Sequence, residues 1–165
     1  MGELAKKDIY ACALPMPAPD KPKKDEWIKT IADSVRVPTE KIFLVGHSLG
    51  VPAILRYLET LDKNQKIGGA VLVSGPIHVL EGDRYRAIDH FMDRPFNFGH
   101  IKKICKKFSV IHGDNDQNVP FRQAVELSKN LNCNLISIPN GGHLNGSSGW
   151  YKLPEALQEL EKMFE

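Results

Sequence analysis

Short runs of consecutive hydrophobic residues alternate along this chain with longer stretches in which hydrophobic residues recur at every third or fourth position. Near-continuous apolar runs are typical of strands in a parallel sheet that is covered on both faces. Runs of this kind predict strands at residues 9–14, 41–45, 70–74, 108–111 and 134–138.

The stretches between these runs have the spacing of amphipathic helices. Trp27, Ile28, Ile31 and Val35, for example, would share one face of a helix. This spacing predicts helices at 25–35, 51–61, 121–131 and 153–164. Alternating strands and helices are typical of a doubly wound α/β domain. We therefore expect a single α/β domain over residues 1–165, with a mostly parallel sheet of about five strands and helices on both faces.

The segment 75–100 breaks this alternation, because it contains several aromatic residues and no clean strand. Long connections inside a compact domain are often lids or binding loops. A pair of irregular helices packed on the edge of the sheet would explain the same pattern. The two interpretations are compatible, and the sequence leaves both open.

Composition and charge narrow the classes of function. Hydrophobic residues make up 42% of the chain and charged residues 25%, which is ordinary for a soluble globular protein. The 22 basic and 20 acidic residues leave a net charge of +2, which does not favour a nucleic-acid or membrane partner. No apolar run approaches the roughly 20 residues that span a bilayer. The first residues also lack the apolar core of a signal peptide.

The cysteines indicate the compartment. Cys12, Cys105 and Cys133 are odd in number, far apart in the sequence and not part of a C-x-x-C pair. We therefore expect no disulfide and no zinc site, and a protein of the reducing cytoplasm.

Candidate chemistry begins at Gly46-His-Ser-Leu-Gly50, between a predicted strand and a predicted helix. A serine on a sharp strand-to-helix turn, in a strained backbone conformation, is an exposed nucleophile at the carboxyl edge of a sheet. Gly46 and Gly50 would leave room for this tight turn. The backbone N–H of Leu49 would lie at a helix N-terminus, where it can stabilise an oxyanion. The sequence thus predicts Ser48 as a nucleophile and Leu49 as an oxyanion donor.

A serine nucleophile on this scaffold needs an acid and then a histidine later in the chain. Asp114 and Asp116 both follow the predicted strand at 108–111. We assign Asp116 as the acid that orients the histidine, with Asp114 as the alternative that more readily rigidifies the turn. His143 follows the last predicted strand after two glycines and would accept the serine proton.

The remaining candidates concern substrate and metal. His47 lies within the serine turn, and Phe91, Phe96 and Phe98 lie in the segment 75–100, so they are candidate contacts of a small substrate. Packing behind the turn is the alternative for His47, and packing in the core is the more common role of aromatic residues such as these three. The histidines lack the close or helical spacing of a metal site. The sequence therefore predicts no metal and no cofactor.

Together these residues resemble the small serine hydrolases of the α/β-hydrolase superfamily, the family of the retinoblastoma-binding protein 9 and YdeN proteins. The resemblance follows the whole chain in order, at Leu14-Pro15, Pro19-Asp20, Glu26-Trp27, Gly46–Gly50, Phe91–Pro95 and Gly142–Asn145. It implies a triad of Ser48, Asp116 and His143 that hydrolyses small carboxylic esters or amides through an acyl-serine.

The resemblance also implies a strand, a His-Gly loop and a helix ahead of the equivalent of Gly2, which this sequence does not show. That strand would lie in the sheet between 9–14 and 41–45, and its loop would donate a second oxyanion amide. We expect either direct pairing of 9–14 with 41–45 or self-association through an unpaired strand edge. Loss of one oxyanion donor costs about 10²–10³ in turnover, so we expect weak activity. The alternative is a non-catalytic binding or assembly protein that retains a hydrolase shell.

Overall fold

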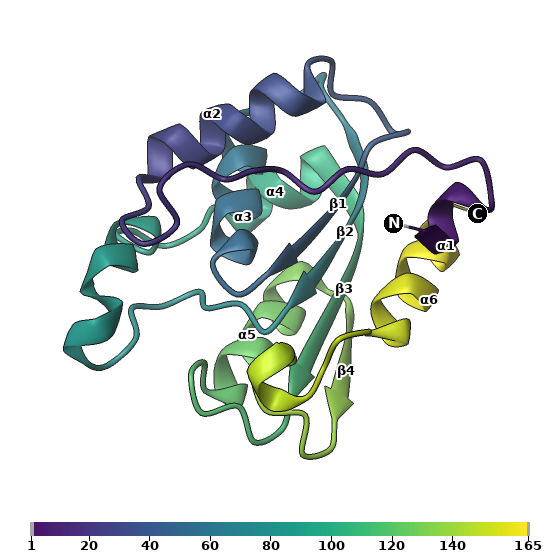
Figure 1. The fold of residues 1–165 in the computed structure, drawn as a ribbon. Helices are drawn as coiled ribbons and strands as arrows, with labels where there is room; N and C mark the ends of the chain where they lie inside the picture. Colours follow the sequence, from purple (N-terminus) through teal and green to yellow (C-terminus); the bar gives the residue numbers. More distant parts are fainter. Residues whose placement is uncertain (1, 165) are drawn as a thin grey trace.

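The computed structural model describes residues 2–164, and at its centre lies a parallel sheet of four strands in the order β1-β2-β3-β4 (Figure 1). The strands are β1 (Phe43–His47), β2 (Ile67–Val73), β3 (Cys105–Gly113) and β4 (Asn134–Ile138). Val45 is opposite Val71, and Val71 is opposite Ser109. Because all four strands run the same way, their carboxyl ends meet at one edge of the sheet.

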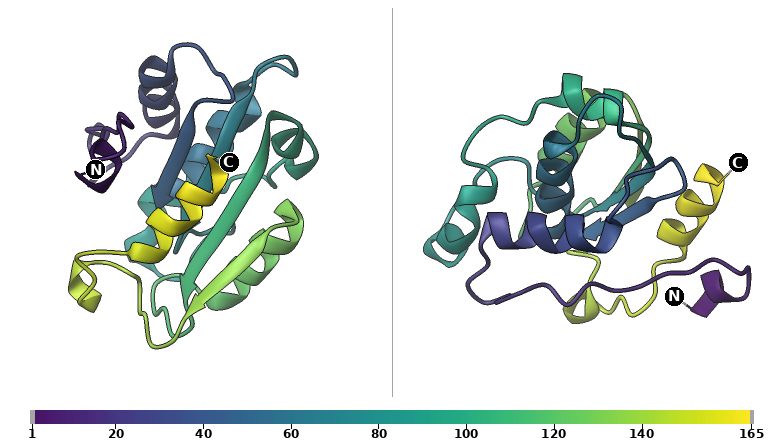
Figure 2. Two further views of the ribbon diagram at one scale, coloured as in Figure 1. Left: turned by 90° about the vertical axis from the view of Figure 1, so that its right-hand side faces the viewer. Right: turned by 90° about the horizontal axis from the view of Figure 1, so that it is seen from above.

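Helices cover both faces of this sheet (Figure 2). One face packs in a single hydrophobic cluster against α2 (Lys24–Val35), α3 (Gly50–Thr60), α4 (Phe98–Ile104) and α5 (Phe121–Leu131). The other face packs against α1 (Gly2–Ala5) and α6 (Pro154–Met163). Two 3₁₀ helices, η1 (Asp83–Phe91) and η2 (Gly146–Ser148), lie in the connections. The predicted doubly wound α/β fold class is confirmed.

The strand predicted at 9–14 is wrong. The described residues contain four strands, and 9–14 run as an extended segment without a strand partner (Figure 1). Ile9 and Ala11 pack partly against the cluster beneath α6, whereas Tyr10 is 90% exposed. The apolar run therefore covers the core without joining the sheet. Direct pairing with β1 is also wrong, and self-association through the outer edge of β1 stays a prediction.

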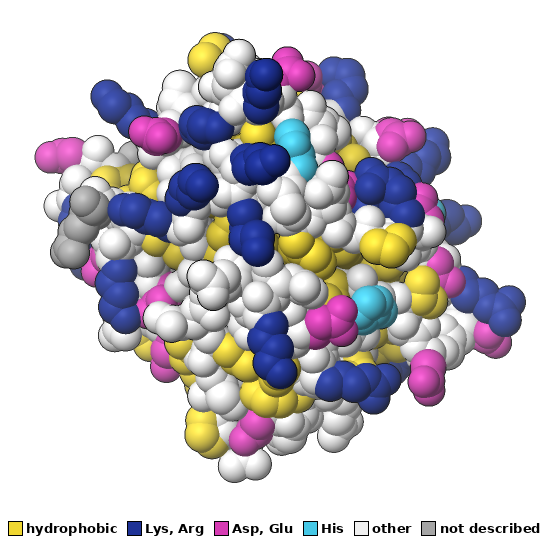
Figure 3. All heavy atoms as spheres, turned by 180° about the vertical axis from the view of Figure 1, so that it is seen from behind, with side chains coloured by type: hydrophobic (Ala, Val, Ile, Leu, Met, Phe, Trp, Pro, Cys, Tyr) yellow, Lys and Arg dark blue, Asp and Glu magenta, His cyan; other side chains and the backbone are white. Residues whose placement is uncertain are grey.

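The surface carries mixed charge. Figure 3 shows Lys and Arg side chains spread over the back of the molecule, with Asp and Glu mostly nearer the rim of this face. No helix within residues 2–164 combines the length and the apolar character that crossing a bilayer requires.

The segment 75–100 is attached to α3 by the side chain of Arg56, which is 1% exposed. Its Nε donates to the carbonyl of Phe91 at 2.9 Å, and Nη2 donates to the carbonyl of Arg94. Nη1 pairs with Glu59 at 2.9 Å, and the guanidinium stacks 3.9 Å from the ring centre of Phe96. One buried cation thus satisfies several carbonyls and fixes the end of the segment.

Replacement of this cation by an apolar side chain should destabilise the protein. We expect Arg56→Met to lower the free energy of unfolding by about 2–4 kcal/mol, because buried carbonyls and Glu59 lose their donor. Urea denaturation measures this loss. Lys29→Met is the control, because Lys29 and Asp33 form an ion pair with side chains 73% and 64% exposed. It should cost less than about 1 kcal/mol. Equal losses in the two variants would contradict the assigned role of Arg56.

Candidate active site

The turn between β1 and α3 holds Ser48 in a strained conformation. Its φ is 52°, in the left-handed region that non-glycine residues rarely adopt, as the sequence predicted. The Ser48 N–H donates to the carbonyl of Val73 at 2.9 Å, which fixes the turn to β2. A Cβ on Gly46 would lie 2.8 Å from the backbone carbonyl of Gly50, so glycine is required where β1 passes the start of α3. Gly50 has open space around it, so the packing role predicted for it is wrong.

The structure brings Ser48, His143 and Asp116 together. His143 Nε2 lies 3.0 Å from Ser48 Oγ, and His143 Nδ1 lies 2.8 Å from Asp116 Oδ2. With Nδ1–H donating to the carboxylate, Nε2 is left to accept the proton of the serine hydroxyl. Asp114, the alternative acid, instead accepts the N–H of Asn140 at 2.8 Å and rigidifies the loop before His143.

Asp116 is held as a carboxylate by the groups around it. Its side chain is fully buried, and Oδ1 accepts the backbone N–H groups of Asn118 and Val119 at 2.8 and 3.1 Å. Burial alone would raise the pKa of Asp116, but hydrogen bonds from His112, His143 and these N–H groups outweigh it and hold the pKa well below its usual range.

His112 is a part of this arrangement that sequence reasoning missed. Its ring is completely buried at the end of β3, where Nε2–H donates to the carbonyl of Val119 at 2.9 Å and lies 3.3 Å from Asp116 Oδ2. The only available signal was its place four residues before Asp116 at a strand end. His112 positions the acid loop and does not reach the serine.

The loop that carries His143 is fixed from several sides. A Cβ on Gly113 would lie 2.2 Å from the carbonyl oxygen of Gly142, so the end of β3 touches this loop. The N–H of His143 donates to Ser148 Oγ at 3.2 Å. His47, a predicted substrate contact, instead donates from Nε2–H to the carbonyl of His143 at 2.8 Å. Desolvation against this loop lowers the pKa of His47, so the ring donates as the neutral imidazole.

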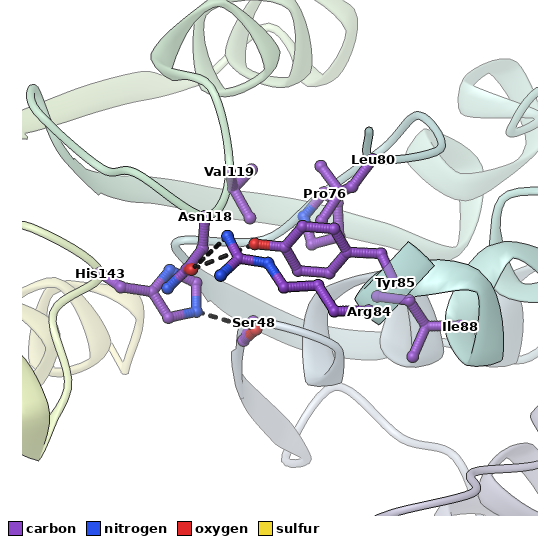
Figure 4. A pocket seen from close by; sticks show the side chains of 9 residues that line it. All are labelled: Ser48, Pro76, Leu80, Arg84, Tyr85, Ile88, Asn118, Val119 and His143. Atoms are coloured by element: carbon purple, nitrogen blue, oxygen red, sulfur yellow. Dashed lines mark hydrogen bonds between the residues drawn. The ribbon is translucent and has the colours of Figure 1, made fainter. Parts of the chain in front are cut away.

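A cavity of about 250 Å³ opens beside Ser48 and His143 (Figure 4). Its other walls come from the segment after β2, from η1 and from the loop after β3. They are Pro76, Leu80, Arg84, Tyr85, Ile88, Asn118 and Val119. No local motif marks these residues, so the sequence did not predict them as contacts.

The aromatic residues predicted as cavity walls lie elsewhere. Phe91 and Phe96 are buried in the core, and Phe98 packs against the same cluster. The ring of Phe91 meets that of Trp27 edge-on at 5.6 Å. The structure thus turns these three phenylalanines toward the core, and Tyr85 is the aromatic residue of 75–100 that lines the cavity.

The predicted oxyanion donor has a free N–H. Leu49 directly precedes α3, and no acceptor within residues 2–164 pairs with its backbone N–H. An amide in this place can stabilise negative charge that develops next to Ser48. Among these same residues, no group of three or more His, Cys, Asp or Glu side chains could hold a metal ion.

The parallel sheet, its two helix layers and the serine turn after β1 are those of an α/β hydrolase. The chain belongs to the serine hydrolase family, whose family model matches residues 3–162. This membership confirms the resemblance found in the sequence.

Individual relatives agree with this assignment. The chain is 33% identical over 156 residues to the YdeN protein of Bacillus subtilis, covering 94% of this chain and 81% of YdeN. The crystal structure of the ydeN gene product matches with a TM-score of 0.92 and 32% identity, covering 99% of this chain and 87% of that one. The serine hydrolase RBBP9 of Rattus norvegicus is 26% identical over 132 residues, or 80% of this chain and 68% of RBBP9.

The low pKa of Asp116 predicts a pH-dependent contribution to stability. A folded-state pKa below the unfolded value of about 3.9 stabilises the fold above that pH, and this stabilisation is lost as the pH falls toward the folded pKa. Wild type should therefore be more stable than Asp116→Asn at pH 7, and this difference in unfolding free energy should become smaller at low pH. We expect the difference to fall by about 1 kcal/mol between pH 7 and pH 3. Urea denaturation at each pH measures it.

Asp114→Asn is the matched control, because it removes an exposed carboxylate from the same turn. Two results would contradict the assigned role of the Asp116 charge. One is a difference in unfolding free energy between wild type and Asp116→Asn that does not change with pH. The other is the same pH dependence in the comparison of wild type with Asp114→Asn.

Proposed function

We propose that this protein hydrolyses small carboxylic esters or amides through an acyl-serine intermediate. The observation that carries the proposal is the hydrogen-bonded series from Ser48 through His143 to Asp116, with distances of 3.0 and 2.8 Å, beside an open cavity. The serine hydrolase family and the hydrolase names of its relatives support the same chemistry.

In the first half of the proposed reaction, Ser48 Oγ attacks the carbonyl carbon of the substrate while His143 Nε2 takes the hydroxyl proton. The N–H of Leu49 stabilises the oxyanion that forms on the carbonyl oxygen. His143 then gives the proton to the leaving oxygen or nitrogen as its bond to carbon breaks. The acyl group remains on Ser48.

In the second half, water attacks the acyl carbon and gives a proton to His143, which returns it to Ser48 Oγ as the acyl–oxygen bond breaks. The products are a carboxylic acid and a free enzyme. Asp116 stays ionised throughout and holds Nδ1–H of His143, which keeps Nε2 directed at the serine.

The size and lining of the cavity favour a short substrate. Its volume of about 250 Å³ is just below the usual range of small-molecule sites. Pro76, Leu80, Ile88 and Val119 offer apolar surface beside Ser48. A short acyl chain fits this space better than a lipid or a long peptide.

We also propose that the protein resides in the reducing cytoplasm. Cys12, Cys105 and Cys133 are all unpaired in the structure. Free thiols at these positions fit a protein of the reducing cytoplasm.

A fluorophosphonate probe tests the nucleophile directly. We expect wild type to be labelled on Ser48 and to hydrolyse 4-nitrophenyl acetate, whereas Ser48→Ala should lose the label and at least about 10³-fold in kcat/KM. Ser34→Ala, which alters an exposed serine of α2, should behave as wild type. Mass spectrometry locates the label, and release of 4-nitrophenol measures turnover.

Two results would contradict the proposal. One is folded wild type that takes no label, and the other is turnover that survives Ser48→Ala. Either result would favour a binding or assembly protein that retains the hydrolase shell.

A further inference from the structure

The cavity beside Ser48 contains an arginine that the proposed reaction does not use. Arg84 lies on η1, and its side chain extends into the cavity that Ser48 and His143 also line (Figure 4). None of the cavity-lining residues within the described part of the chain is acidic. A cation is therefore present within reach of a substrate bound at Ser48.

Neighbouring arginines are neutralised by carboxylates, but Arg84 is not. Arg86 pairs with Asp83 at 2.8 Å, and Arg94 pairs with Glu59 at 2.8 Å. No carboxylate within residues 2–164 forms an ion pair with Arg84. The positive charge at the cavity therefore has no acidic partner in the described part of the chain.

Polar and aromatic groups hold Arg84 in this place. Its guanidinium lies 4.5 Å from the ring centre of Tyr85, a cation–π contact. Asn118 Oδ1 accepts the hydroxyl of Tyr85 at 3.1 Å and Nη2–H of Arg84 at 3.4 Å. Asn118 is itself fixed, because its N–H donates to Asp116 Oδ1 at 2.8 Å. The cation is thus connected to the loop that carries the acid of the triad.

We propose that Arg84 makes the cavity selective for esters or amides that carry a carboxylate a few bonds from the scissile carbonyl. A guanidinium binds a carboxylate with two parallel hydrogen bonds. The long hydrogen bond from Arg84 to Asn118, at 3.4 Å, can be exchanged for the two bonds to a substrate carboxylate. The inference rests on the proposed function, because it concerns the substrate of the same serine. The small cavity limits the substrate to a short acid monoester or a comparable amide.

Paired esters that differ in charge test this selectivity. Monoethyl glutarate carries the anion on the acyl group, with diethyl glutarate as its neutral counterpart. O-acetylglycolate carries the anion on the leaving group, with ethyl acetate as its counterpart. We expect wild type to have the higher kcat/KM for the anionic member of at least one pair, and the favoured pair tells which side of the ester faces Arg84.

Variants at position 84 separate charge from structure. Arg84→Gln should lower kcat/KM for the favoured anionic ester by about 5- to 20-fold, as loss of an exposed charged hydrogen bond does, and change the neutral ester by less than about 2-fold. Arg84→Lys should retain most of the preference, because it keeps the charge. Arg86→Gln is the matched control on the same helix and should leave both esters unchanged. Equal losses on anionic and neutral esters, or no loss, would overturn the proposal.

A second readout does not depend on turnover. Monoethyl glutarate or O-acetylglycolate should slow the labelling of Ser48 by an uncharged fluorophosphonate more than its neutral counterpart does, and Arg84→Gln should remove the difference. If Ser48 is labelled but neither anionic ester slows the labelling more than its neutral counterpart, the role of Arg84 is overturned while the proposed hydrolase stands. A folded wild type that takes no label overturns the proposed hydrolase, and with it this inference.

Discussion

The hydrogen-bonded ladder of the parallel sheet is the constraint on which the candidate site depends. The ladder continues one residue past the strands: Ser48 N–H donates to Val73 O, Ser74 N–H to Ile111 O, and Asp114 N–H to Ile138 O, at 2.9, 2.9 and 3.1 Å. The loops that carry the serine, the acid and the histidine therefore leave the sheet along one line. Side chains 95 residues apart in sequence, Ser48 and His143, reach hydrogen-bonding distance for this reason.

The contacts that fix the cavity walls differ from those that fix the triad, because the walls are held by side chains of α3 and α5. Gln123 of α5 accepts the backbone N–H groups of Ile77 and His78 at 2.8 and 2.9 Å, and Arg56 of α3 holds the end of the same segment. The segment between these anchors supplies four of the nine lining residues, namely Leu80, Arg84, Tyr85 and Ile88. Substitutions on its cavity side can thus change which substrate fits without moving Ser48 or His143.

The sequence predicts those parts of the protein that depend on local signals. Ser48 lies between glycines after an apolar run, and Asp116 and His143 each follow a strand, so parallel topology alone brings them together. The run 9–14 has the composition of a strand, but hydrophobicity does not show whether a neighbouring strand is there to pair with it. Arg84 contacts Asn118 across two loops, and no sequence pattern marks that contact. The inward turn of Phe91 likewise depends on Trp27 and on tertiary packing.

In the proposed reaction, Ser48 becomes acylated because His143 and Asp116 activate it. Intact-protein mass spectrometry after rapid acid quench, during turnover of an ester with a good leaving group, measures this step most directly. We expect a mass gain of one acyl group located at Ser48, which appears before the acid product accumulates and is absent from His143→Ala. Acid product formed without any acylated protein, or an acyl group at another residue, would contradict it.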